Sequence, residues 1–193
     1  SHELLVRGGH AYVTAQDHDP VTGDPIERLH VLDVSDPTAP RQVGVLDLPG
    51  VLPSGEGCPG LTMSDRALVI GTGDGLALVD VSDPTRPVLT GELEDDPQTG
   101  LIQVRAVTAS GDRGYVSLRT RASPAADFVS AVDLADPAAA RMVTGTKTRS
   151  LPYSLALSAD HLFAGTYDGL QMYDTNRATL LRPFGSIALP AVA

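Results

Sequence analysis

One segment of this chain occurs four times in altered form, and this repetition constrains the fold more than any other feature. Residues 75–91 read GLALVDVSDPTRPVLTG, and residues 29–40 read LHVLDVSDPTAP. Shorter versions follow at 130–137 (SAVDLADP) and 170–175 (LQMYDT). Each version alternates apolar or β-branched residues up to an aspartate, which is typical of a half-buried strand. The Ser-Asp-Pro after the first two strands predicts a tight turn into another strand.

The spacing of the repeats predicts the architecture. The aspartates that end the four strands are Asp33, Asp80, Asp133 and Asp174, so successive repeats lie 47, 53 and 41 residues apart. A four-stranded antiparallel propeller blade takes about 40 to 50 residues. We therefore predict an all-β fold, a β-propeller of four-stranded antiparallel blades with four blades in this chain. A single domain is expected, with blades near residues 1–48, 49–96, 97–148 and 149–193.

The repeat text resembles the LVIVD repeat family of β-propellers, whose pattern reads VxDVSDPxxP. The match is strongest at 29–40 and 76–87, weaker in the third repeat, where Ala135 replaces the serine, and poor in the fourth, where Thr175-Asn176 replaces Ser-Asp-Pro. The resemblance implies a propeller and no particular chemistry. Because bacterial and archaeal members are often exported or attached to the surface, it also implies an extracellular or cell-surface location, with a cytoplasmic one left open.

The closure of the propeller has three alternatives. The four blades could close on themselves, form part of a longer propeller, or pair with a second chain in an eight-bladed ring shared by a homodimer. Propellers have four to eight blades, so all three arrangements fit the number of repeats. We favour the closed four-bladed ring, because an open arc would leave two sheet faces exposed to water.

The charge of the chain excludes two classes of partner. The formal net charge is -10, from 24 acidic and 14 basic residues. A protein that binds nucleic acid without regard to sequence needs a basic surface to displace counterions, so no nucleic-acid partner is expected. Attachment to an anionic membrane surface is disfavoured for the same reason, and no direct membrane insertion is expected because no apolar run is long enough.

The repeated aspartates are predicted to be structural. A ligand-binding group is usually unique, whereas Asp33, Asp80, Asp133 and Asp174 occur once per blade. An aspartate in a turn commonly accepts hydrogen bonds from the backbone N–H groups that follow it. We therefore interpret these residues and the Ser-Asp-Pro turns as supports of the backbone.

The candidate ligand site lies at one end of the propeller, where the connections between second and third strands and between successive blades meet. We call this end the top face. An anionic ligand there could be held by arginines with help from tyrosines. The candidate residues are Glu56, Cys58, Arg105, Arg119, Arg149, Tyr153 and Tyr167. Solvated rim charges, and a small buried thiol at Cys58, are the alternative interpretations, since no base is placed near that cysteine by sequence.

A second candidate site is a metal site in the first blade. Asp17, His18 and Asp19 stand together in a long connecting segment, and such side chains could bind Ca²⁺ or another divalent ion. The spacing lacks that of an EF-hand loop, so a solvated hairpin tip is the alternative. No other cofactor is predicted.

These observations leave two classes of function. The first is a binding or interaction domain that presents a top-face groove to a protein, a glycan or a small acidic ligand. The second is an enzyme, such as a lyase, cyclase or hydrolase, that uses the top-face channel mouth as its pocket. The fold itself does not decide between them.

Overall fold

The structure is a computed structural model that describes residues 3–19, 21–49, 60–72, 75–96, 100–120, 124–176 and 181–188. Its strands form four antiparallel sheets in which each strand pairs with the next in the chain. Blade 1 contains β1 (Leu4–Arg7), β2 (His10–His18), β3 (Pro25–Asp33) and β4 (Arg41–Asp47). Blade 2 contains β5 (Leu61–Met63), β6 (Leu68–Thr72), β7 (Gly75–Asp80) and β8 (Val88–Leu93).

Blades 3 and 4 complete the predicted architecture. Blade 3 contains β10 (Gly100–Ser110), β11 (Arg113–Thr120), β12 (Asp127–Asp133) and β13 (Arg141–Lys147), and blade 4 contains β14 (Pro152–Ser158), β15 (His161–Thr166), β16 (Gly169–Asp174) and β17 (Arg182–Ala188). A two-residue strand, β9 (Asp95–Asp96), extends the sheet of blade 3. The only helical element among the described residues is the 3-10 turn η1 (Pro137–Ala139). The predicted all-β fold with four blades is confirmed.

The strand-end aspartates hold the turns, as predicted. The side chain of each accepts a hydrogen bond from the backbone N–H two residues later: Asp33 from Ser35, Asp80 from Ser82, Asp133 from Ala135 and Asp174 from Asn176. The aspartates of the Ser-Asp-Pro turns do the same for Thr38 and Thr85. Each carboxylate therefore accepts hydrogen bonds from backbone N–H groups that have no partner in the sheet, because the strand has ended.

Successive blades pack face to face. We call the face that a blade turns toward the following blade its forward face, and the opposite one its rear face. Blade 1 packs on blade 2 through residues such as Leu29 and Val31 against Leu68 and Val79. Blades 2 and 3 share the cluster that contains Leu76, Leu78, Val116, Leu118 and Val132. Blades 3 and 4 share the cluster that contains Tyr115, Val129, Ala131, Leu162 and Tyr173.

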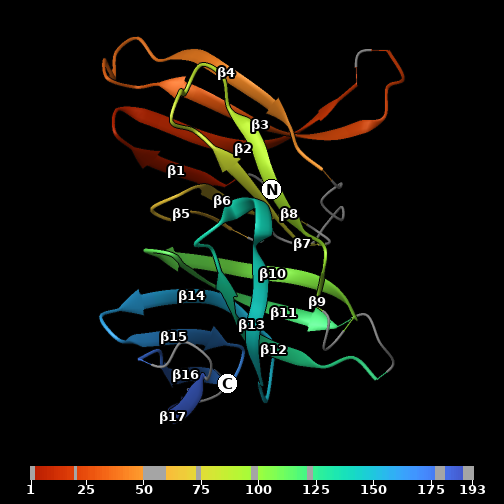
Figure 1. Cartoon of the computed structure of the whole chain (residues 1–193), viewed down its shortest axis with the longest axis vertical. Coiled ribbons are helices and arrows are strands. Elements are labelled where there is room, and N and C mark those ends of the chain that lie inside the picture. Colours follow the sequence, from red (N-terminus) through yellow and green to blue (C-terminus); the bar gives the residue numbers. More distant parts are fainter. Residues whose placement is uncertain are drawn as a thin grey trace, which may run out of the picture.

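The four blades form an open arc. Figure 1 shows them stacked in chain order, with blade 1 (red and orange) and blade 4 (blue) at opposite ends. The described strands of blade 1 and blade 4 share no packed interface like those between successive blades. The expectation of a closed four-bladed ring is therefore wrong for this structure. The physical reason is that the described core residues join blade 1 to blade 2, blade 2 to blade 3 and blade 3 to blade 4, and none of these cores joins blade 4 to blade 1.

None of the three cores formed by the described residues covers the rear face of blade 1 or the forward face of blade 4. A search of the described residues found no helix long and apolar enough to cross a membrane.

Candidate functional site

The top face does not surround a single channel mouth, because the arc is open. Its connections join β2 to β3, β11 to β12 and β15 to β16, and they also join each blade to the next. The candidate residues therefore lie along a row of blade tops. Glu56 and Cys58 fall outside the described residues.

Arg119 is held by a carboxylate of its own blade. It lies opposite Asp127 in the register of β11 and β12. Its Nε donates to Asp127 Oδ1 at 2.7 Å and its Nη2 donates to Asp127 Oδ2 at 3.1 Å. This two-point pairing satisfies the carboxylate and neutralises much of the positive charge that a ligand would meet.

Arg105 lies on the inner strand of blade 3, at the irregularity in the pairing of β10 with β11 between Val104 and Ala106. Its Nη2 donates to Gln103 Oε1 at 2.9 Å. The structure thus directs part of the Arg105 guanidinium toward a side chain on the same strand, and Arg105 does not line the groove that contains Arg149.

Arg149 lies in a groove that β13 and blade 4 form together. β13 ends at Lys147, and the chain then crosses to β14. Thr146 Oγ1 donates to the carbonyl oxygen of Leu181 at 2.7 Å, which ties β13 to blade 4 below the groove. The groove has a volume of about 280 Å³ and its described lining residues are Lys147, Arg149, Gln171, Tyr173, Pro183, Gly185 and Ser186.

The polar groups of this groove are mainly donors. Tyr173 Oη donates to Gln171 Oε1 at 2.7 Å, which leaves the Gln171 amide nitrogen as a donor. Burial raises the pKa of Tyr173 to about 12, so the phenol stays protonated at neutral pH. None of the described lining residues is an aspartate or a glutamate. We call this site the Lys147–Arg149 groove.

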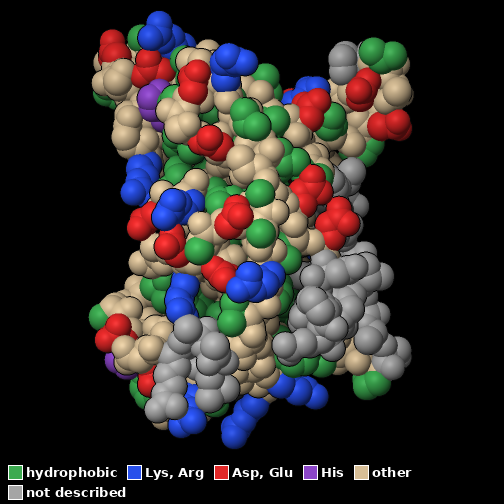
Figure 2. Space-filling model, viewed as in Figure 1, with side chains coloured by type: hydrophobic (Ala, Val, Ile, Leu, Met, Phe, Trp, Pro, Cys, Tyr) green, Lys and Arg blue, Asp and Glu red, His purple; other side chains and the backbone are tan. Residues whose placement is uncertain are grey.

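A smaller hollow of about 90 Å³ adjoins the groove and shares Arg149, Gln171 and Ser186 with it. Its acidic lining residue, Asp168, accepts a hydrogen bond from Ser150 Oγ. In the view of Figure 2, Lys and Arg side chains lie along the lower margin of the molecule, near the end of β13. The groove brings two cationic side chains, Lys147 and Arg149, together on a chain whose net charge is -10.

The two candidate tyrosines are both exposed but stand apart from the groove lining. Tyr153 lies on β14, and Tyr167 lies in the turn between β15 and β16. Tyr167 is next to Asp168 in the chain, so it stands close to the smaller hollow. Neither tyrosine is among the residues that line the Lys147–Arg149 groove.

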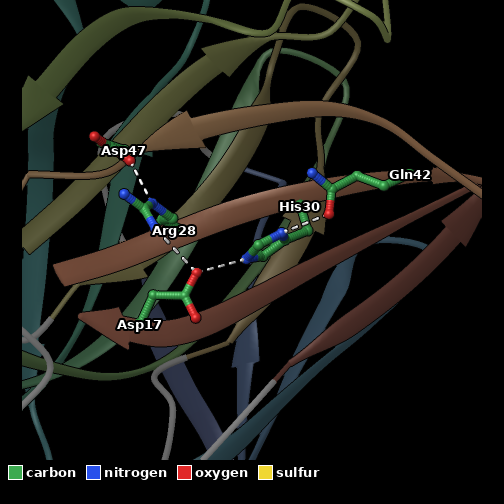
Figure 3. A network of polar contacts seen from close by, with 5 residues as sticks. All are labelled: Asp17, Arg28, His30, Gln42 and Asp47. Atoms are coloured by element: carbon green, nitrogen blue, oxygen red, sulfur yellow. Dashed lines mark hydrogen bonds and ion pairs between the residues drawn. The ribbon is translucent and has the colours of Figure 1, made fainter. Parts of the chain in front are cut away.

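The candidate metal ligands of blade 1 have other partners in this structure (Figure 3). Asp17 Oδ2 lies 3.3 Å from Arg28 Nη1 and 3.4 Å from His30 Nε2. Arg28 Nε also donates to Asp47 Oδ1 at 2.7 Å, and His30 Nδ1 lies 3.1 Å from Gln42 Oε1.

Asp19 and His18 do not join this network. Asp19 Oδ1 accepts from the backbone N–H of Val21 and of Thr22, and those hydrogen bonds lower the pKa of its carboxyl. His18 ends β2 with an exposed side chain. No group of three metal-binding side chains was found among the described residues. A divalent ion at Asp17, His18 and Asp19 stays a prediction.

The sequence interpretation missed the part of the groove that comes from blade 4. Gln171 and Tyr173 belong to the fourth repeat, which matches the repeat pattern poorly. Only the strand register shows that both side chains point toward blade 3. It also missed a hollow of about 370 Å³ at the opposite end of blade 3, lined by Asp112, Arg113, Asp133 and Arg141 among others.

The hollow at the opposite end belongs to the repeated turn. Arg141 Nη2 donates to Asp133 Oδ2 at 2.8 Å, and Arg41 makes the same pair with Asp33 at 2.9 Å in blade 1. A corresponding hollow of about 260 Å³ lies beside that second pair. An aspartate followed eight residues later by an arginine is the sequence pattern that could have predicted these ion pairs. Both hollows therefore contain the ion pair of the repeated turn.

Comparison with known proteins supports the fold. The LVIVD repeat model matches residues 1–47 and 68–95, which confirms the predicted resemblance for blades 1 and 2. No curated protein matches the chain.

Two solved structures are similar to the chain at low sequence identity. One is a putative 6-phosphogluconolactonase from Bacteroides uniformis, with a TM-score of 0.70 and 11% identity over 96% of this chain and 56% of that one. The other is the AfRom2 CNH domain, with a TM-score of 0.56 and 11% identity over 97% of this chain and 54% of that one. The chain therefore spans about half the length of the structures it resembles, and this likeness concerns the fold alone.

Proposed function

We propose that this chain, an array of four blades that resembles LVIVD-repeat proteins, is a binding domain that holds a carboxylate-bearing ligand in the Lys147–Arg149 groove. The observation that carries the proposal is the lining of that groove. Two cationic side chains, an amide and a buried phenol line it, and no carboxylate stands among its described residues. The Lys147 and Arg149 cations and the Gln171 amide nitrogen are the donors of this lining, and they are suited to a ligand that brings the negative charge.

The other arginines of the top face support this choice by contrast. Arg119 already binds a carboxylate, since Asp127 occupies its guanidinium at two points. The Asp127 carboxylate thus occupies the position that a ligand carboxylate would take on Arg119. Arg149 has an exposed side chain and lines both hollows of this region, so a carboxylate from outside can reach it.

The size of the groove restricts the ligand. A volume of about 280 Å³ is at the lower limit of sites that hold small molecules. It accommodates one unit of the size of a uronic acid or an acidic amino acid. That unit could be a free acid or one residue of an acidic glycan or peptide, and the chemistry recognised would be the same.

The test is a calorimetric titration with glucuronate and, as a matched uncharged probe, glucose. We expect glucuronate to bind and glucose not to bind. Lys147→Gln and Arg149→Gln should each weaken the binding of glucuronate about 10-fold or more, because each removes a charge-assisted hydrogen bond. The matched control is Arg113→Gln, at the other end of blade 3.

Two further arms separate the sources of the ligand. Glutamate and an oligomer of galacturonate are titrated under the same conditions, and the one that binds more tightly identifies the class. Equal affinity of the wild type and both groove variants for every acidic probe would refute the proposal. An extracellular or cell-surface location, as the family resemblance implies, is part of the same proposal and is tested by fractionating cells that express the chain.

A further inference from the structure

The smaller hollow beside the Lys147–Arg149 groove differs from it in chemical character. Its volume is about 90 Å³, and its described polar side chains are those of Arg149, Thr166, Asp168, Gln171 and Ser186. Three of these residues, Arg149, Gln171 and Ser186, line the groove as well. We call this space the Asp168 hollow. Because the two spaces share a wall, a ligand unit bound in the groove borders directly on the Asp168 hollow.

The Asp168 hollow contains acceptors of hydrogen bonds. Asp168 Oδ1 accepts from Ser150 Oγ, whereas Oδ2 accepts no hydrogen bond from the residues that the structure describes, and the side chain is exposed. Thr166 Oγ1 donates to the carbonyl oxygen of Gly169 at 3.0 Å, so the lone pairs of this hydroxyl stay available. A ligand group suited to this hollow therefore brings hydrogens to donate.

Arg149 and Asp168 line the same hollow with opposite charges, and within the described part of the chain they form no ion pair with each other. A ligand hydroxyl between them can donate to Asp168 and accept from Arg149 at the same time. A ligand carboxylate can only accept, so Asp168 would repel it, and an ammonium group can only donate, so Arg149 would repel it. The pair therefore favours an uncharged unit that carries hydroxyl groups.

The turn that carries Asp168 also presents an aromatic ring. Thr166 pairs with Gly169 in the register of β15 and β16, so this turn contains only Tyr167 and Asp168. The Tyr167 side chain is 91% exposed. A single exposed aromatic residue needs no explanation by itself, but this one stands next to a carboxylate that suits hydroxyl groups. A sugar offers both features, since its hydroxyls donate hydrogen bonds and the C–H face of its ring packs on the apolar body of a tyrosine.

We propose that the ligand of this site is an acidic glycan in which a uronate unit is joined to a neutral sugar unit. The uronate lies in the Lys147–Arg149 groove, and hydroxyls of the neutral unit lie in the Asp168 hollow. At about 90 Å³ the hollow holds one edge of that unit, and the rest of its ring contacts Tyr167 at the surface. This inference rests on the proposed function and narrows its ligand. It disfavours runs of adjacent uronates and peptides with successive acidic residues, because their second carboxylate would face Asp168.

The first test is a calorimetric titration with two tetrasaccharides and their acidic units. The hyaluronan tetrasaccharide alternates glucuronate with neutral N-acetylglucosamine, whereas every unit of tetragalacturonate is charged. We expect the hyaluronan tetrasaccharide to bind about 10-fold more tightly than glucuronate, because its neutral unit adds a hydrogen bond to an ionised carboxylate and a ring contact. We expect tetragalacturonate to show no such gain over galacturonate, since Asp168 repels the second carboxylate.

The second test removes the two features of the turn separately. Asp168→Asn keeps the size of the side chain and removes its charge, so it should weaken the binding of the hyaluronan tetrasaccharide about 10-fold and strengthen the binding of tetragalacturonate. Opposite changes for the two glycans cannot arise from damage to the fold. Tyr167→Ala should also weaken the binding of the hyaluronan tetrasaccharide, and Tyr167→Phe, which keeps the ring, should restore most of the affinity that Tyr167→Ala loses.

The matched control for the loss of a carboxylate is Asp160→Asn. Asp160 is exposed in the turn between β14 and β15, at the opposite end of blade 4. This variant should bind every probe as the wild type does.

The outcomes separate this inference from the proposed function. If glucuronate binds but the hyaluronan tetrasaccharide binds no more tightly, or if tetragalacturonate is the tighter of the two tetrasaccharides, the neutral unit is wrong and the binding of acids in the groove stands. If Asp168→Asn shifts both tetrasaccharides in the same direction, the role of Asp168 is overturned. If neither glucuronate nor either tetrasaccharide binds, the proposed function is wrong, and this inference is wrong with it.

Discussion

Glu27 is a carboxylate that the fold buries. It lies on β3 opposite Gln16, with 3% of its surface exposed. Neither of its carboxylate oxygens has a hydrogen-bond partner among the residues that the structure describes. Burial of the charged form raises the pKa of Glu27 from 4.5 to about 7.

This shift predicts how stability depends on pH. In the unfolded chain Glu27 ionises near its ordinary pKa, so between 4.5 and about 7 the folded chain binds more protons than the unfolded one. The contribution of Glu27 to stability is fully present below pH 4.5 and is lost as the pH rises through 7. One pKa unit corresponds to about 1.36 kcal/mol, so the total loss is about 3 kcal/mol.

The assay is urea unfolding of the wild type and of Glu27→Gln between pH 4.5 and pH 8.5. Glutamine keeps the shape of the side chain and cannot ionise. We expect Glu27→Gln to be the more stable protein at pH 8.5 and the difference to disappear, or to change sign, at pH 4.5. The free energy of unfolding of the wild type should fall by about 3 kcal/mol more than that of the variant across this interval.

Glu92→Gln is the matched control, because Glu92 has an exposed side chain on β8. Its stability should follow the wild type at every pH. If the curves of the wild type and Glu27→Gln stay parallel from pH 4.5 to pH 8.5, Glu27 ionises as freely in the folded chain as in the unfolded one. The reasoning from burial would then be refuted.

Two further predictions concern the Asp-Pro turns that join the third and fourth strands of a blade. Gly91→Ala should destabilise the chain by about 1 to 3 kcal/mol, because the new methyl group would collide with the backbone oxygen of Pro137; an unchanged urea midpoint would contradict this. The hydroxyl and N–H of Ser35 and the Arg41 guanidinium hold the pKa of Asp33 well below its usual range, so its contribution to stability is present above pH 3.8 and is lost as the pH falls further. Asp33→Asn should therefore weaken the dependence of the unfolding midpoint on pH below 4, and an identical acid profile for both proteins would argue against the turn as its source.

The fold was largely predictable from the sequence because the blade is a local unit. Alternating residues such as Leu76 and Leu78 predict a strand, and the aspartate and proline that follow predict its turn. The structure confirms both, down to the hydrogen bonds that Asp33 and Asp80 accept from the backbone. What the repeat text did not predict was the short strand β9, which departs from the four-strand pattern.

The candidate site was predictable only in part. Arg149 was expected at the top face, and it lies there in a groove with Lys147. Arg119 was a candidate for the same ligand, and the structure pairs it with Asp127, its cross-strand neighbour, which the sequence analysis did not foresee. Gln171 and Tyr173 were not expected, because the side of a sheet that a residue faces depends on register and on which blade packs there.

The sequence by itself determined the module, its number of copies and the chemistry of its turns, since strand alternation and the bonds of aspartate and proline act over a few residues. Only the tertiary structure decided that the described blades form an open arc, which cations a neighbouring carboxylate neutralises and which side chains of blade 4 line the Lys147–Arg149 groove. Those outcomes depend on the angle between packed sheets and on distances between residues far apart in the chain. No local pattern contains that information.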